Sequence, residues 1–105
     1  MTNDIGTIVP TRLDDYVTDT LLRDLVGHDR SASAFVVYLF LWTRCARERR
    51  GKARLSHATI ASETGLSKSA VQAALRILHR RKLVHSERRH QTDTPEHAVL
   101  RPWNA

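Results

Sequence analysis

The chain has 105 residues, of which 41% are hydrophobic and 27% are charged, with 17 basic against 11 acidic side chains. This length supports one domain with a single modest core. The single cysteine, Cys45, excludes an internal disulfide framework and is typical of a reducing cytosol. No basic segment followed by an apolar one opens the chain, so we expect no export and a cytoplasmic location.

Charge is divided unevenly along the chain. Residues 1–29 hold six acidic and two basic side chains, whereas residues 30–105 hold fifteen basic and five acidic ones. A segment that basic is typical of a phosphate-binding surface, although a solvated surface can have the same composition. The acidic segment is a candidate for contact with a protein partner or for shielding of the basic surface.

The first elements expected are an arm and a helix. Residues 1–12, with Gly6 and Pro10, are predicted to form a flexible arm. Residues 13–27 have apolar side chains at helical spacing, which predicts an amphipathic helix that ends near Gly27. Its apolar positions are Leu13, Tyr16, Val17, Leu21 and Leu25, with Leu22 and Val26 partly on the same side.

Residues 31–50 are predicted to form a long helix, with Ser31 or Ser33 as its cap and Gly51 behind it. Residues 34–42 (AFVVYLFLW) are all apolar. This run is too short to cross a bilayer, so we expect no membrane partner. A helix that is apolar on every side must be covered from more than one direction. Two coverings remain open, the N-terminal helix of the same chain or a two-fold homodimer, and we favour the homodimer.

The region with the clearest pattern is residues 55–82, which predicts two helices joined by a tight turn. Ser56 and Ser67 stand where helix caps are preferred, because a serine oxygen accepts a hydrogen bond from an unsatisfied first-turn amide. Gly65 stands where the chain leaves the first helix through the left-handed region. We assign six positions to structure alone: Gly65, Leu66, Val71, Leu75, Leu78 and Leu83.

The pattern IAxxTGLSKSxVxxxLxxLxxxxLV, at residues 60–84, resembles the winged helix-turn-helix domains of bacterial regulators in the MarR-like and GntR-like group. The resemblance implies a mainly α fold with a small β-hairpin, here a single domain at residues 13–105 with extra N-terminal helices. It also implies that the helix after the turn enters the major groove and that a hairpin wing follows. The wing is expected at residues 84–101, with strands at 84–89 and 97–101. Lys82 departs from the pattern, since such families often have glycine there.

The outward side of the second helix carries the side chains expected to contact DNA. Gln72 is placed to bond an adenine edge through its amide, although glutamine is also an ordinary exposed helix residue. Lys68 and Ser69 lie in the first turn, where backbone amides and the positive end of the helix favour phosphate. Arg76 lies one turn beyond Gln72 and can reach guanine or phosphate, and Ala73 belongs to the same outward face.

Two other segments are expected to add contacts. Ser56 and His57 begin the preceding helix, where a phosphate contact is expected unless Ser56 serves only as a cap. Arg88, Arg89 and His90 cluster at the predicted hairpin tip, which suits the minor groove or the flanking backbone. A basic hairpin more often clamps phosphates than reads bases.

Further basic residues have competing explanations. Lys52 and Arg54 lie in a predicted connector at residues 51–54, where they can meet a backbone phosphate. Residues 80–82 (RRK) close the second helix, where contact with DNA and compensation of the helix dipole are equally plausible.

Catalytic and metal-binding patterns are missing from the sequence. There is no nucleophile elbow, no glycine-rich phosphate loop and no HExxH motif, so we expect neither an enzyme nor a cofactor. His85 and His97 are placed where they can face each other across the hairpin, but two ligands do not close a metal site. Cys45, within an apolar helix, is expected to be a small core residue.

The sequence therefore predicts a small protein that binds double-stranded DNA, as a homodimer, and represses transcription by occupying a promoter. Two alternatives remain. One is a DNA-binding protein of plasmid or phage replication or partition, and the other is a winged helix used as a protein-interaction module.

Overall fold

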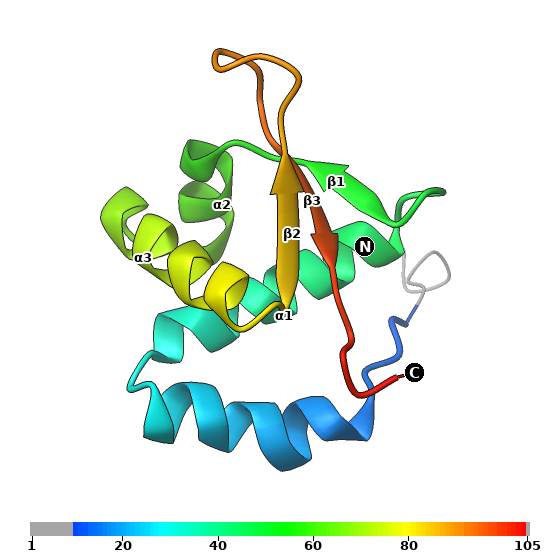
Figure 1. Cartoon of the computed structure of the whole chain (residues 1–105), viewed down its shortest axis with the longest axis vertical. Coiled ribbons are helices and arrows are strands. Elements are labelled where there is room, and N and C mark those ends of the chain that lie inside the picture. The colour runs from blue at the N-terminus through cyan, green and yellow to red at the C-terminus, as the bar shows by residue number, and fades with distance from the viewer. Residues whose placement is uncertain (1–9, 105) are drawn as a thin grey trace, which may run out of the picture.

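The computed structural model describes residues 10–104, in which helices pack against a small antiparallel sheet (Figure 1). The structure confirms the predicted combination of helices with a small β-hairpin. Residues 1–9, and with them most of the predicted arm, lie outside the described residues. The elements in chain order are η2 (Val17–Leu21), η3 (Arg23–His28), α1 (Ala32–Ala46), β1 (Lys52–Arg54), α2 (His57–Thr64), α3 (Lys68–Arg80), β2 (Val84–Glu87) and β3 (Glu96–Val99).

The N-terminal helix, residues 15–28, comprises η2 and η3 and is wound mostly as a π-helix, with hydrogen bonds to the fifth preceding residue. The amide of Asp29 donates to the carbonyl of Asp24 in this pattern, at 2.9 Å. Val17, Leu21 and Leu25, spaced four apart, are its buried residues. The predicted amphipathic helix is therefore present, with a wider turn than the sequence pattern predicted.

Helix α1 begins as predicted but ends earlier. The side chain of Ser31 accepts a hydrogen bond from the amide of Ala34 at 3.0 Å. Arg47 caps the other end, so the prediction of a helix to residue 50 was wrong. Gly51, with a φ of +73°, instead closes a turn in which its amide donates to the carbonyl of Glu48 at 3.0 Å. Within residues 10–104, neither α1 nor any other helix has the length and apolar content needed to span a membrane.

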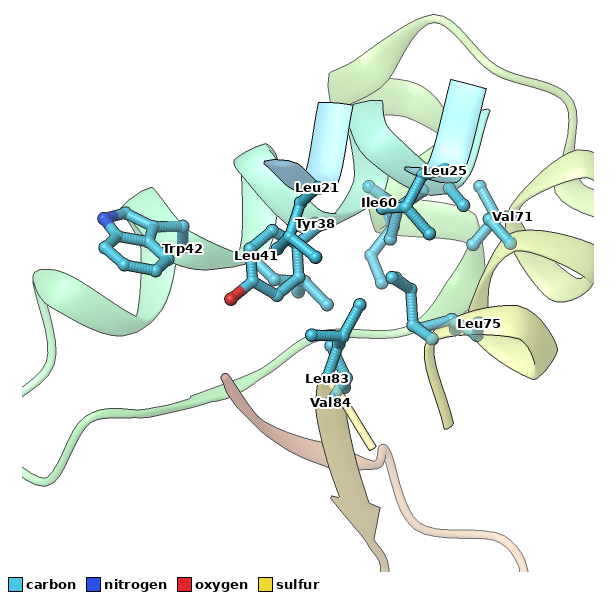
Figure 2. Packing of buried hydrophobic residues seen from close by; sticks show 14 of the residues in the cluster. Leu21, Leu25, Tyr38, Leu41, Trp42, Ile60, Val71, Leu75, Leu83 and Val84 are labelled. Atoms are coloured by element: carbon cyan, nitrogen blue, oxygen red, sulfur yellow. The ribbon is translucent and has the colours of Figure 1, made fainter. Parts of the chain in front are cut away.

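Helix α1 occupies the centre of the core because both the N-terminal helix and the α2–α3 pair pack on it (Figure 2). Leu21 lies beside Tyr38 of α1, while Leu25 lies near Ile60 and Val71. The hydroxyl of Tyr38 donates to the carbonyl of Leu100 at 3.0 Å. The N-terminal helix thus covers α1 within the same chain, which is one of the two predicted coverings.

Helices α2 and α3 form as the local pattern predicted. Ser56 accepts a hydrogen bond from the amide of Thr59 at 3.0 Å, and Ser67 accepts one from the amide of Ala70 at 3.1 Å. Gly65 ends α2 in the left-handed region with a φ of +81°. The buried side of α3 consists of Val71, Ala74, Leu75 and Leu78.

The sheet has three strands in the order β1-β3-β2, rather than the two predicted. Strands β2 and β3 pair antiparallel from Val84 opposite Val99 to Glu87 opposite Glu96, and both are shorter than predicted. The added strand β1 lies in the predicted basic connector, where Ala53 is buried between two exposed basic residues. The hairpin loop, residues 88–95, projects from the end of the molecule opposite the N-terminal helix (Figure 1).

Candidate nucleic-acid interface

Three segments bring basic side chains to one region: the start of α2, the start of α3 and the hairpin loop. The pKa of His57 at the start of α2 is lowered by burial and, further, by the positive charges of Arg88 and Lys68. Arg88 belongs to the hairpin loop and Lys68 is the first residue of α3. The amide of Leu55, just before α2, donates to the carbonyl of Pro95 in the hairpin loop at 3.1 Å, and α2 packs on α3. The three segments therefore lie near one another, although their residues are up to 31 apart in the chain.

The outer side of α3 carries the side chains that the sequence predicted to contact DNA. Lys68, Ser69 and Arg76 are exposed, whereas Gln72 and Ala73 are half-buried. Within residues 10–104, the side chains of Lys68 and Arg76 form no hydrogen bond or ion pair. Two cations and one amide therefore lie along this side, on a helix held rigidly by its buried face.

The predicted residues at the start of α2 divide by role. Ser56 both accepts from the amide of Thr59 and donates its hydroxyl proton to the Thr59 Oγ1 at 2.9 Å, so it acts as a helix cap. His57 is half-buried beside the charges described above. Of the two, His57 has the freer side chain for a ligand.

The hairpin loop is basic and partly ordered by its own hydrogen bonds. Arg88 donates to the carbonyl of Gln91 at 3.0 Å, which holds its guanidinium against the loop. Arg89 and His90 are exposed. The loop therefore presents its positive charge at the tip of a projecting hairpin.

Arg81 at the end of α3 does not belong to this surface. It binds Asp29 through two hydrogen bonds, one of them from Nη2 to Oδ1 at 2.8 Å. These bonds hold the pKa of Asp29 well below its usual range. Arg81 thus ties the end of α3 to the N-terminal helix, a role that the sequence did not indicate because the partners are 52 residues apart.

A hydrogen-bond chain that the sequence did not predict lies under the same region. His97 is 1% exposed, and its Nε2–H donates to the carbonyl of Leu55 at 3.0 Å. Because a carbonyl can only accept, the Nδ1 of the neutral ring accepts from Ser86 Oγ at 2.6 Å. Ser86 in turn accepts from His79 Nε2 at 2.8 Å. This series of hydrogen bonds links α3, β2 and β3 to the start of α2.

The prediction that His85 and His97 can face each other was wrong. His85 pairs with Ala98 and His97 with Ser86, so the two rings lie on opposite faces of the sheet. His85 instead contacts Glu87 at 3.0 Å. Among the residues that the structure describes, no three histidine, cysteine, aspartate or glutamate side chains form a group able to hold a metal ion.

Comparison with known proteins assigns no family. No protein-family model, curated protein or solved structure matches the chain.

The surface formed by α3, the start of α2 and the hairpin loop suits a large anion. It offers guanidinium, ammonium, amide and hydroxyl groups on one rigid helix, next to a projecting basic loop. Two carboxylates of the acidic segment are bound elsewhere: Asp29 by Arg81, and Asp14 by Arg101 at 3.4 Å and by Trp103 Nε1 at 3.1 Å. The N-terminal helix lies away from the hairpin loop, so its acidic groups do not cover the basic surface (Figure 1).

Proposed function

We propose that this chain is a winged helix-turn-helix protein that binds double-stranded DNA with sequence specificity and regulates transcription, most simply by repression. The observation that carries the proposal is the outer side of α3, where Lys68 and Arg76 have no side-chain partner within residues 10–104, next to the basic hairpin loop. An α-helix fits the major groove of B-DNA, and a basic projection beside it suits the flanking backbone.

The residues divide between two tasks in this proposal. Gln72 and Arg76 read base edges, because amide and guanidinium groups form paired hydrogen bonds with adenine and guanine. Lys68, Ser69, His57 and the loop residues Arg88, Arg89 and His90 contact phosphates, with Ser56 holding the helix that carries His57. The small side chain of Ala73 allows α3 to approach the wall of the groove closely.

A homodimer remains part of the proposal. Leu22 and Val26 on the N-terminal helix and Val36 on α1 are still 37–39% exposed, although the same two elements cover each other within the chain. A two-fold pair joined near these residues presents two copies of α3 to half-sites about one helical turn apart.

The deciding experiment is selection of bound sequences from a pool of random duplex DNA at near-physiological salt. A two-fold symmetric motif is the expected result and supplies the operator. Directly repeated sites favour a replication or partition role. Absence of binding even at low salt overturns the proposal and favours a protein-interaction module.

Two substitutions separate base reading from phosphate binding. Gln72→Ala is expected to cost roughly 1–3 kcal/mol on the selected site and little on random DNA, because it removes a base contact. Arg88→Gln is expected to weaken binding to every sequence and to reduce the salt slope by about one. Fluorescence anisotropy titrations at several salt concentrations measure both. Equal losses for Gln72→Ala on both DNAs contradict base reading, and an unchanged slope for Arg88→Gln contradicts phosphate contact.

A further inference from the structure

A second basic cluster lies at the turn between α1 and β1. Residues 44–54 contain six basic side chains and one acidic one, Glu48. Arg44 is paired with Glu63 at 3.0 Å, and Arg54 lies 3.9 Å from Glu96. The four others are exposed and form no side-chain hydrogen bond or ion pair within residues 10–104: Arg47, Arg49, Arg50 and Lys52.

Local structure accounts for only two of these four charges. Arg47 stands at the C-terminus of α1, where a cation offsets the helix dipole. Lys52 lies on the edge strand β1, where charge discourages pairing with another chain. Arg49 and Arg50 lie between helix and strand and have neither role. The turn that carries them is held by a hydrogen bond from the amide of Glu48 to the carbonyl of Cys45, at 3.1 Å.

A cavity beside this turn adds two further arginines. The cavity has a volume of about 920 Å³, and Arg12, Arg47 and Arg101 are among the residues that line it. The guanidinium of Arg101 lies 5.7 Å from the ring centre of Trp42, which fixes its position. Asp14, which contacts Arg101, is the one carboxylate paired with these three arginines in the described part of the chain.

We call the exposed cations of this turn, together with the arginines of the cavity beside it, the turn surface: Arg12, Arg47, Arg49, Arg50, Lys52 and Arg101. The turn between α1 and β1 and the helix α3 lie on opposite sides of the molecule, with strands β2 and β3 between them (Figure 1). The two basic surfaces therefore face different directions, so one straight duplex laid along α3 leaves the turn surface open.

We propose that the turn surface binds the phosphate backbone of a second DNA duplex, so that one protein molecule holds two duplexes together. Guanidinium groups bind phosphate oxygens through paired hydrogen bonds, and five of the six residues are arginines. The surface contains no helix that fits a groove, so its binding is independent of sequence. This inference rests on the proposed function, since it needs a first duplex on α3.

The test is a bridging assay with the full chain. One duplex of about 20 base pairs, roughly two helical turns, is fixed to beads, and a second, labelled duplex is added with the protein. Wild-type protein is expected to retain the labelled duplex on the beads. Arg49→Gln with Arg50→Gln is expected to lower that retention roughly tenfold while leaving binding to a single duplex intact. Arg23→Gln with Arg30→Gln removes two exposed charges elsewhere and serves as the matched control.

The outcomes separate this inference from the proposed function. Retention by the Arg49/Arg50 variant at the wild-type level overturns the inference and assigns any bridging to a dimer with two copies of α3. Wild-type protein that binds a single duplex without bridging also overturns it, with the proposed function intact. If Arg76→Gln leaves single-duplex binding unchanged while the Arg49/Arg50 variant abolishes it, the turn surface is the DNA site and the role proposed for α3 fails.

Discussion

Lys82 shows how one residue can adopt a conformation that its side chain disfavours. Its φ is +57°, in the left-handed region where glycine has no steric cost. The amide of Lys82 donates to the carbonyl of His79 at 3.0 Å, and the amide of Leu83 donates to the carbonyl of Leu78 at 2.9 Å. These two bonds form a Schellman motif that ends α3. The departure from glycine noted in the sequence therefore leaves the turn geometry unchanged and adds backbone strain.

Replacing Lys82 with glycine should relieve that strain. The left-handed conformation costs a residue with a Cβ roughly 1–2 kcal/mol, and the greater freedom of glycine in the unfolded chain offsets part of the gain. We expect Lys82→Gly to raise the free energy of unfolding by about 0.5–1 kcal/mol, measured by urea denaturation. Lys82→Ala removes the same charge but keeps the Cβ, so it should give no such gain. Equal stability of the two variants would contradict this explanation.

At the scale of elements, the pair of Arg81 and Asp29 joins the end of α3 to the end of the N-terminal helix. The side chain of Asp29 is only 12% exposed, and that of Arg81 is 31% exposed. A charged hydrogen bond in such a site contributes more than one at the open surface. The N-terminal helix is therefore anchored by this pair as well as by its apolar face.

Removal of either partner should loosen this anchor without affecting DNA binding. We expect Asp29→Asn and Arg81→Gln each to lower the free energy of unfolding by about 1–3 kcal/mol. The double variant should lose less than the sum, because both changes remove the same interaction. Denaturation of all four proteins measures this coupling. A lower salt slope of DNA binding for Arg81→Gln would instead show that Arg81 contacts phosphate.

At the scale of the whole molecule, three histidines make stability depend on pH: His97 is buried, His57 is half-buried, and His79 is exposed but loses part of its hydration. Burial is the largest cause that lowers the pKa of His57, His79 and His97 below the usual 6.5. The folded protein therefore binds these protons less tightly than the unfolded chain does. The neutral histidines stabilise the fold fully above pH 6.5, and this contribution is lost as the pH falls below it.

We expect the melting temperature to fall between about pH 7.5 and about pH 5.5, the range in which ordinary histidines gain a proton. His97→Asn should lower stability at the upper pH by about 1–3 kcal/mol, because the hydrogen-bond chain is broken. It should also make the dependence on pH shallower, since one titrating group is gone. Differential scanning calorimetry across the range measures both effects, and an unchanged slope would refute the role of His97.

Much of the α2–α3 pair was predictable because its signals are local. The caps Ser56 and Ser67, the left-handed Gly65 and the buried side of α3 each depend on residues within one or two turns. The outer side of α3 followed from the same periodicity, so its candidate contacts could be named before the structure. Whether these residues bind DNA remains a prediction.

Features that depend on distant pairing were not visible. Strand β1 is only three residues long, and a pattern this short marks no strand until β3 supplies its hydrogen-bond partners. The register of β2 and β3 decided which histidine is buried, since a shift by one residue turns every side chain to the other face. The ion pair of Arg81 and Asp29 likewise forms only when α3 and the N-terminal helix are packed together.

Sequence was thus sufficient for the presence of the helices, the caps of α2 and α3 and the excess of positive charge, because these depend on neighbours along the chain. Only the tertiary structure decided which faces of the strands are buried, which cations are already paired and how two basic surfaces come to point in different directions. The physical reason is that side-chain burial and ion pairing are properties of groups brought together in space, whereas capping and periodicity act within a few residues.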